Sequence, residues 1–151
     1  MQKFRSRFAA LILFCTLSTA CGDGADEADD DDEGGPPPPA LVGTWTYQSV
    51  TVDETLASLG EVLDWVPDAV EARLQLLENG AFVYEEVNAQ GGQLFAESGF
   101  VVVTVDEVGR GTIEFNVDGV ETPASFMLVT DDSLVLTERA GTTTTAFTLF
   151  R

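Results

Sequence analysis

Histidine is absent from this chain of 151 residues, lysine occurs only as Lys3, and the two cysteines are Cys15 and Cys21. The chain beyond Cys21 has no thiol and no imidazole, which excludes disulfides, cysteine-based metal sites and most nucleophile–base pairs. Catalysis by carboxylates remains possible. However, Glu85 and Glu86 are neighbours on a predicted strand and point to opposite faces, so they cannot act as a pair. We therefore predict that the protein is not an enzyme and that it holds no metal and no cofactor.

Positive charge is also scarce. Seven Lys and Arg residues face 26 Asp and Glu residues, and the formal net charge is −19. Removal of residues 1–20 would leave four Arg against the same 26 acids, a net charge of 4 − 26 = −22. A surface this acidic repels nucleic acid and anionic lipid headgroups and attracts cations and basic partners. Nucleic acid is therefore not an expected partner.

The apolar stretch near the start of the chain is short. Residues 8–17 form a run of ten, fewer than a bilayer-spanning helix needs. Three basic residues precede this run, and Ser18, Thr19 and Ala20 follow it directly before Cys21. A basic start, a short apolar core and small residues at a cleavage site predict a secretory signal peptide over residues 1–20.

The small residues before Cys21 resemble the lipobox of bacterial lipoproteins, with Leu17 one place early and Ser18 in its usual position. The resemblance implies that the Cys21 thiol receives a diacylglycerol, that the peptide is cut just before it, and that the new amino terminus is acylated. Acyl chains such as palmitate would anchor the protein to a membrane at about 0.8 kcal/mol per buried CH2. The expected location is the bacterial cell envelope, on the periplasmic or surface face of the outer membrane. An ordinary signal peptide followed by an incidental cysteine is the alternative.

A tether is expected over residues 21–40. Residues 22–39 read GDGADEADDDDEGGPPPP, in which eight of eighteen residues are acidic and none is aromatic or branched. Such a segment cannot bury enough apolar surface to fold, and its prolines favour an extended polyproline II end. We predict a disordered spacer between the membrane and a domain at residues 41–151. A sorting signal and loose calcium binding are alternatives, although the run lacks the spacing of a calcium loop.

Beyond the prolines, apolar and polar residues alternate with a period of two. The alternation predicts strands near residues 41–49, 70–76, 82–84, 100–105, 113–117, 124–129, 134–136 and 142–150. Asn79-Gly80 and Asp118-Gly119 are strong hairpin turns. Eight strands, all joined by hairpins except the first pair, predict an antiparallel up-and-down barrel, because closure removes free edges. Pro123 lacks an N–H, so we expect it at a strand start or a bulge.

One segment departs from this period. Leucines and valines of residues 53–66 recur at helical spacing, with Asp53 as a candidate N-cap and Pro67 as the stop. The spacing predicts one helix of roughly three to four turns between the first and second strands. This helix could cover one mouth of the barrel, plug its bottom or cover a seam between strands.

Gly43-Thr44-Trp45 on the first strand resembles the Gly-x-Trp motif of lipocalins. Across residues 41–151, the hairpin LQLLENGAFVYEE, the later DDSLVLT and a threonine-rich last strand resemble bacterial lipocalin-like domains of the calycin superfamily. The resemblance implies that Trp45, next to Gly43, closes the base of the barrel and that Arg151 packs across its ring. A helix between the first two strands departs from typical lipocalins and is similar to the fatty-acid-binding branch of the superfamily.

Large side chains supply the candidate interior. The predicted interior residues are Trp45, Tyr47, Phe82, Tyr84, Phe100, Phe115, Phe126, Leu134, Leu136 and Phe147, of which the first seven are the predicted ligand-binding set. An eight-stranded barrel has room either for a filled core or for one small ligand. Glu86 shares a face with Phe82 and Tyr84; if buried, it needs a partner such as Arg151 or a tyrosine hydroxyl, and otherwise it lies in water at the open end.

Two functions follow from this interior. The first is a membrane-anchored, monomeric lipoprotein whose lipocalin-like barrel binds a small hydrophobic or amphipathic molecule. The second is a tethered protein-interaction module with a solid core and no ligand. A pocket above about 300 Å³ would favour the first function, and a dry interior with an exposed apolar patch would favour the second.

Overall fold

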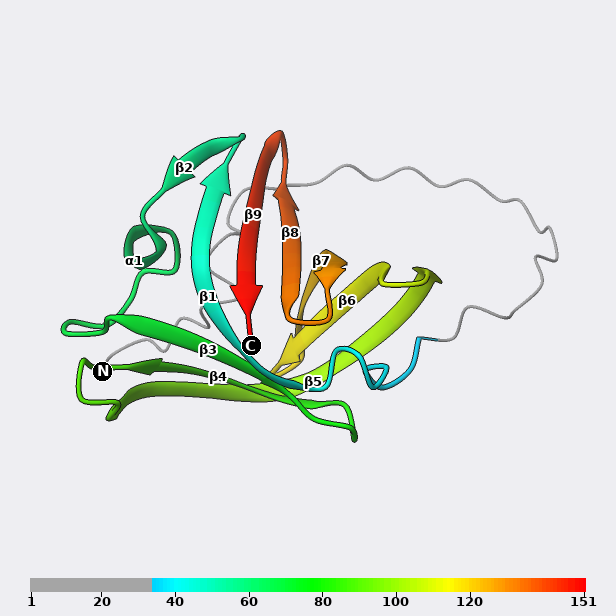
Figure 1. The fold of residues 1–151 in the computed structure, drawn as a ribbon, viewed down its shortest axis with the longest axis horizontal. Coiled ribbons are helices and arrows are strands. Elements are labelled where there is room, and N and C mark those ends of the chain that lie inside the picture. The colour runs from blue at the N-terminus through cyan, green and yellow to red at the C-terminus, as the bar shows by residue number, and fades with distance from the viewer. Residues whose placement is uncertain (1–33) are drawn as a thin grey trace, which may run out of the picture.

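A computed structural model describes residues 34–151, so the predicted signal peptide, Cys21 and the tether up to residue 33 lie outside the described residues. The described chain forms one antiparallel sheet and one short helix (Figure 1). The elements are β1 (Gly43–Val52), β2 (Thr55–Ala57), α1 (Leu59–Val62), β3 (Glu71–Leu76), β4 (Ala81–Val87), β5 (Gln93–Glu107), β6 (Arg110–Val117), β7 (Val120–Thr130), β8 (Ser133–Ala140) and β9 (Thr143–Phe150). Within this described part, no helix has the length and apolar character needed to cross a bilayer.

The sheet closes on itself because β1 has a partner on each side. Strands β3 to β9 pair in chain order, while β1 pairs with β3 through residues 43–46 and with β9 through residues 46–52. Eight strands form the ring, and β2 adds to the far end of β1. Figure 1 shows β1, β8 and β9 running steeply across β3, β4 and β5. The predicted fold class, an all-β, eight-stranded antiparallel up-and-down barrel, is confirmed.

The helix predicted over residues 53–66 is wrong in extent. Asp53 and Glu54 have positive φ angles of 47° and 65° and turn the chain from β1 into β2. The Asp53 carboxylate accepts a hydrogen bond of 2.8 Å from the backbone N–H of Thr144, so it ties the turn to the start of β9 instead of capping a helix. Only the four residues of α1 are helical. Strand pairing with β1 therefore prevails over the helical spacing of the side chains.

The segment from β2 to Trp65 covers a seam. Beyond Thr46, β1 no longer pairs with β3, and Figure 1 shows α1 beside this part of β1. Leu59, Val62, Leu63 and Trp65 pack against the core there. The segment therefore packs against the core beside β1, at the point where β1 has left β3.

The end of the predicted tether is bound to the barrel. Gly35 donates a hydrogen bond of 2.9 Å to the Val103 carbonyl and accepts one of 2.7 Å from the Val103 N–H. The β4–β5 ladder ends at Phe100, so the next residues of β5 have free backbone groups that Gly35 satisfies. Residues 34–40 are therefore part of the domain, which corrects the expectation that they are a free spacer.

Pro123 lies inside β7, opposite Glu114, and not at a strand start or a bulge. The β7–β8 ladder begins only at Ser125, so Pro123 has a neighbouring strand on one side. A residue without an N–H is tolerated on such a free edge. Pro123 is therefore free of strand pairing on one side because the β7–β8 ladder does not extend to it.

Candidate functional site

One end of the barrel is closed by Trp45. Its side chain is fully buried, and its indole N–H donates a hydrogen bond of 2.8 Å to the Leu41 carbonyl. The guanidinium carbon of Arg151 lies 4.3 Å from the centroid of the Trp45 ring. Arg151 also donates to the carbonyls of Ala40 at 2.7 Å and Val42 at 3.2 Å. This is the contact between Trp45 and the end of the chain that we expected from the sequence.

Gly43 lies beside that contact. Its φ angle is +141°, a conformation that side chains rarely adopt, and a Cβ at this position would lie 3.4 Å from Nη1 of Arg151. That distance is an ordinary van der Waals contact, so a larger residue would be disfavoured here chiefly by the backbone conformation. The Gly-x-Trp motif therefore supplies both the ring and the backbone turn beside it.

Nine of the ten predicted interior residues are buried, and Phe100 is not. Phe100 is 67% exposed on the outer face of β5, whereas Val101 and Val103 face the core. Residues 100–105 are apolar on both faces, so alternation alone did not indicate which face is inside. The prediction that Phe100 lines the interior is wrong. The buried members are Trp45, Tyr47, Phe82, Tyr84, Phe115, Phe126, Leu134, Leu136 and Phe147.

The interior rings contact one another edge to face. Tyr47 lies 5.9 Å from Tyr84 and 5.6 Å from Phe147, measured between ring centroids. Phe95, which the sequence analysis missed, joins the group at 6.3 Å from Tyr84. Phe95 is half-buried on β5 and lies opposite Glu86. Its signal in the sequence was the two-residue spacing Phe95, Glu97, Gly99, Val101, which extends the strand towards its start.

Away from Trp45, the lining becomes polar. Glu86 is fully buried; its Oε1 accepts a hydrogen bond of 3.0 Å from the Tyr84 hydroxyl, and its Oε2 accepts one of 2.7 Å from the backbone N–H of Val66. The tyrosine partner is one of the two that the sequence suggested. Glu86 is not paired with Arg151 and does not lie in open water. It joins β4 to the segment that covers the seam.

Two further carboxylates face inward at this end. Glu97 lies opposite Tyr84 across β4 and β5, and Glu138 lies opposite the buried Thr145 across β8 and β9. Both glutamates are half-buried. The sequence analysis missed them, although Glu138 continues the inward series of Leu134 and Leu136. We call Glu86, Glu97, Glu138 and the hydroxyls of Tyr47 and Tyr84 the polar end.

Burial governs the electrostatics of the polar end. Loss of solvent raises the pKa of Glu138 to about 7. Burial also raises the pKa of Tyr47 far above its ordinary value, and the nearby charge of Glu138 raises it further. Burial raises the pKa of Tyr84 in the same way, with smaller contributions from Tyr47 and Glu86. Both hydroxyls therefore stay protonated at neutral pH, whereas Glu138 titrates there.

The wall beside the polar end is incomplete. β7 and β8 pair only from Ser125–Thr137 to Thr130–Ser133. Residues 120–124 therefore pair with β6 alone, and residues 138–140 pair with β9 alone. The β7–β8 ladder is therefore incomplete between the start of β7 and the end of β8, and Glu138 lies there on the inward face of β8.

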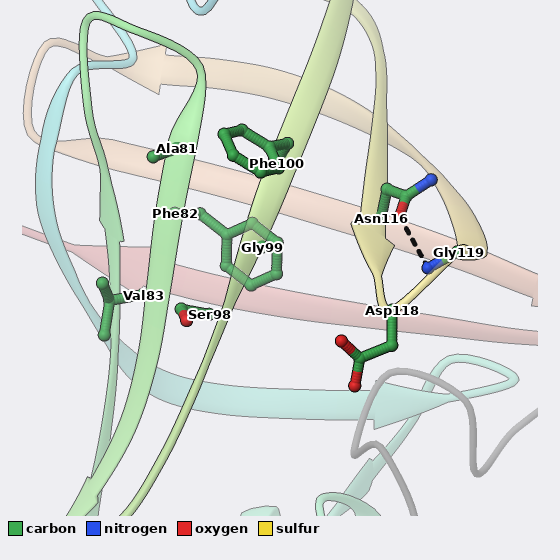
Figure 2. Close-up of a pocket in the computed structure, with 9 residues that line it drawn as sticks. All are labelled: Ala81, Phe82, Val83, Ser98, Gly99, Phe100, Asn116, Asp118 and Gly119. Atoms are coloured by element: carbon green, nitrogen blue, oxygen red, sulfur yellow. Dashed lines mark hydrogen bonds between the residues drawn. The ribbon is translucent and has the colours of Figure 1, made fainter.

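A groove lies on the outside of the barrel, over β4, β5 and the β6–β7 turn (Figure 2). Its volume is about 490 Å³, and Phe100 forms part of its wall. Asn116 shapes the turn at its edge by accepting a hydrogen bond of 3.1 Å from the Gly119 N–H. A smaller groove of about 320 Å³ lies on the outside of β6, β7 and β8. Neither groove contains the polar end.

Among residues 34–151, no three acidic side chains are grouped so that they could hold a metal ion. The polar end brings together carboxylates, hydroxyls and aromatic faces, a combination suited to an organic molecule. No protein-family model, curated protein or solved structure matches this chain.

Proposed function

We propose that this protein is a lipid-anchored protein of the bacterial cell envelope whose barrel binds one small amphipathic molecule. The observation that carries the proposal is the division of the inner surface into two parts. Around Trp45 the lining is apolar and fully buried, with Leu41, Leu76, Leu134 and Leu149. At the opposite end it carries the carboxylates and hydroxyls of the polar end.

In a barrel whose interior is filled only for stability, a lining that contains buried carboxylates would be unfavourable. Burying a carboxylate costs free energy unless it is well paired, and apolar residues of the same size are often more stabilising. Carboxylates held beside aromatic rings inside a closed sheet are instead typical of sites in which a few polar groups orient an apolar ligand. The two-part lining therefore favours a molecule with an apolar body and a polar head.

Native mass spectrometry tests the binding. The protein is purified from the cells that make it, and we expect a fraction that carries one small molecule. Ala124 is buried and faces inward, so Ala124→Phe should fill the interior and remove the adduct. Ser125 faces outward on the same strand, and Ser125→Phe serves as the matched control. If cooperatively folded wild-type protein carries no adduct, and the Ala124→Phe and Ser125→Phe variants behave alike, ligand binding is rejected.

The anchor is tested separately. Cells grown with an alkyne analogue of palmitate should label the protein and retain it with membranes. Cys21→Ser should abolish the label, whereas Cys15→Ser should leave it unchanged because Cys15 lies within the predicted signal peptide. Equal labelling of both variants and the wild type would reject Cys21 as the lipidation site.

The outer groove favours a second candidate function, a tethered module that binds a protein partner. Phe100 is 67% exposed at its wall, and such a large exposed ring often marks a contact surface. A photo-crosslinking amino acid at position 100 should then give one adduct of defined mass in cells. The same residue at Val129, exposed on β7, is the control. No adduct at position 100 would remove this candidate.

A further inference from the structure

We infer that the outer groove of about 490 Å³ binds a basic segment of a partner protein. An apolar side chain of that segment packs against Phe100, and its cationic side chains pair with Asp118 and Glu121. The inference rests on the second candidate function and adds the chemistry of the partner. It depends on the form of the groove, on an exposed aromatic ring and on the sign of the charge around that ring.

The groove is hollow because much of its lining is small. Four of its nine lining residues are alanine, serine or glycine. Figure 2 shows the side chains of Ala81 and Val83 on one side of β5 and those of Asn116 and Asp118 on the other. The groove therefore crosses three neighbouring strands on the outside of the barrel. Such a surface receives the side chains of a segment that lies along it.

Phe100 gives the groove an apolar anchor point. Its side chain is 67% exposed, and the next outward residue of β5, Val102, is 46% exposed. Apolar surface of this kind gains free energy when a partner removes it from water. An aromatic ring also attracts a lysine or arginine side chain that lies over its face. The occupant therefore combines an apolar side chain with positive charge.

The edge of the groove is acidic. Asp118 lines it, and Glu121 lies opposite Asn116 on the outer face of the β6–β7 pair. Glu114 follows on the same face of β6, opposite Val102. Within residues 34–151 none of these three carboxylates has an ion pair, and no arginine lines the groove. A cationic side chain would meet opposite charge there without displacing another cation.

Charge also disfavours the other occupants of this groove. The chain has a net charge of −19, so a second copy is repelled. Residues 22–33, which precede the described part, include eight acids and carry the same sign as the edge of the groove. Anionic lipid headgroups and nucleic acid are repelled for the same reason. A basic segment of another protein is the occupant that matches both the apolar and the acidic surface.

Fluorescence polarisation with three labelled peptides tests the inference on the purified protein. The peptides share a Val-Trp-Val core and carry two lysines, two serines or two glutamates on each side. At physiological salt, the lysine peptide should bind the wild type at least about fivefold more tightly than the serine peptide, and the glutamate peptide should bind most weakly.

Substitution of the aromatic ring tests the anchor. Phe100→Ser should weaken binding of both the lysine and the serine peptide at least about fivefold, because the apolar contact is lost with either. Val129 is 56% exposed on β7, so Val129→Ser is the matched control and should change neither affinity more than about twofold. Both substitutions replace exposed side chains, so the barrel should remain folded.

Substitution of the acidic edge tests the charge. Asp118→Asn combined with Glu121→Gln should weaken the lysine peptide at least about fivefold and change the serine peptide less than about twofold. Asparagine tolerates the φ angle of 52° at position 118. Asp106 and Glu107 are exposed near the β5–β6 turn, so Asp106→Asn combined with Glu107→Gln removes the same charge elsewhere and should leave both affinities unchanged.

The outcomes separate this inference from the second candidate function. If the crosslink at position 100 forms in cells but the three peptides bind alike or not at all, the inference is overturned while that function stands. If both charge variants weaken the lysine peptide equally, the peptide is attracted to the acidic surface in general, and the inference is overturned. A protein dimer that Phe100→Ser dissociates would place a second copy in the groove and overturn it as well. If no peptide binds and no crosslink forms, both fail.

Discussion

At the scale of single residues, two groups at opposite ends of the barrel determine its character. Arg151 covers Trp45 and satisfies backbone carbonyls at the closed end. Glu138 places a half-buried carboxylate at the polar end, and loss of solvent raises its pKa. The first group contributes stability, and the second lowers stability at neutral pH because its buried charge is costly. Both effects can be measured by substitution.

Substitution of Arg151 should weaken the closed end. Arg151→Ala loses the cation–π contact and the hydrogen bonds to the carbonyls, which predicts a loss of about 1–3 kcal/mol in the free energy of unfolding. The free energy of unfolding of Arg151→Lys should fall between those of the wild type and Arg151→Ala, because an ammonium group cannot reproduce the planar fork of donors. Urea denaturation monitored by tryptophan fluorescence measures the change. Arg110, exposed on β6, is the control, and Arg110→Ala should stay within about 0.5 kcal/mol of the wild type.

Glu138 should make stability depend on pH. Its pKa in the folded protein is about 7, above the ordinary glutamate value of 4.5, so the folded state holds the proton more tightly than the unfolded state. The free energy of unfolding of the ligand-free protein should therefore fall as pH rises from about 4.5 to 7. Glu138→Gln lacks this component, so its advantage over the wild type should be larger at pH 8 than at pH 5, by on the order of 1–3 kcal/mol. Urea denaturation at both pH values measures it, and equal differences would contradict the assignment.

At the scale of elements, the segment from β2 to Trp65 depends on Glu86. The hydrogen bond from the Val66 N–H to Oε2 of Glu86 fastens the end of this segment to the interior of β4. The Trp65 indole N–H, although close to the Tyr84 hydroxyl, lacks a hydrogen-bond partner of good geometry in the described chain. The cover of the seam is therefore held by a few polar contacts and by packing.

Removal of the Glu86 carboxylate should loosen the segment. Glu86→Ala removes the hydrogen bonds that the carboxylate accepts from the Tyr84 hydroxyl and the Val66 N–H, which should cost about 1–3 kcal/mol. Amide hydrogen exchange should become faster over residues 58–66 than in the strands. Glu85 lies next to it and faces outward, so Glu85→Ala is the control. Unchanged exchange at Val66 in the Glu86→Ala variant would show that packing alone holds the cover.

At the scale of the whole molecule, closure of the sheet requires close approach of strands at particular positions. Gly99 lies where β5 passes from β4 to β6, and a Cβ there would collide with the Asn116 carbonyl and press against the Phe82 ring. A side chain at Gly99 would force β5 and β6 apart. The absence of a side chain thus permits the strong bend of β5.

Gly99→Ala should therefore destabilise the whole barrel. We expect a loss of about 1–3 kcal/mol, the usual cost of overpacking. Gly35 has open space where its Cβ would lie, so Gly35→Ala should change stability by less than about 0.5 kcal/mol. Thermal and urea denaturation of both variants measure the difference. Similar stabilities of the two variants would show that β5 and β6 can separate without loss.

Local chemistry was sufficient to predict the strands and the barrel. Alternation with a period of two is a property of neighbouring residues, so it placed Trp45, Tyr47, Phe82 and Tyr84 inside wherever the opposite face was polar. The closing contact of Arg151 with Trp45 followed from the motif and the end of the chain. These features depend on short stretches of sequence and could be read before any fold was known.

Only the tertiary structure decided the rest. The orientation of Phe100 depends on which face of an entirely apolar strand meets the core, and the fate of residues 53–66 depends on competition from β1 and β9. The contacts of Tyr47 with Tyr84 and Phe147 join strands β1, β4 and β9, which are far apart in the sequence. Contacts between distant segments carry no local period, so the polar end emerged only when the sheet closed.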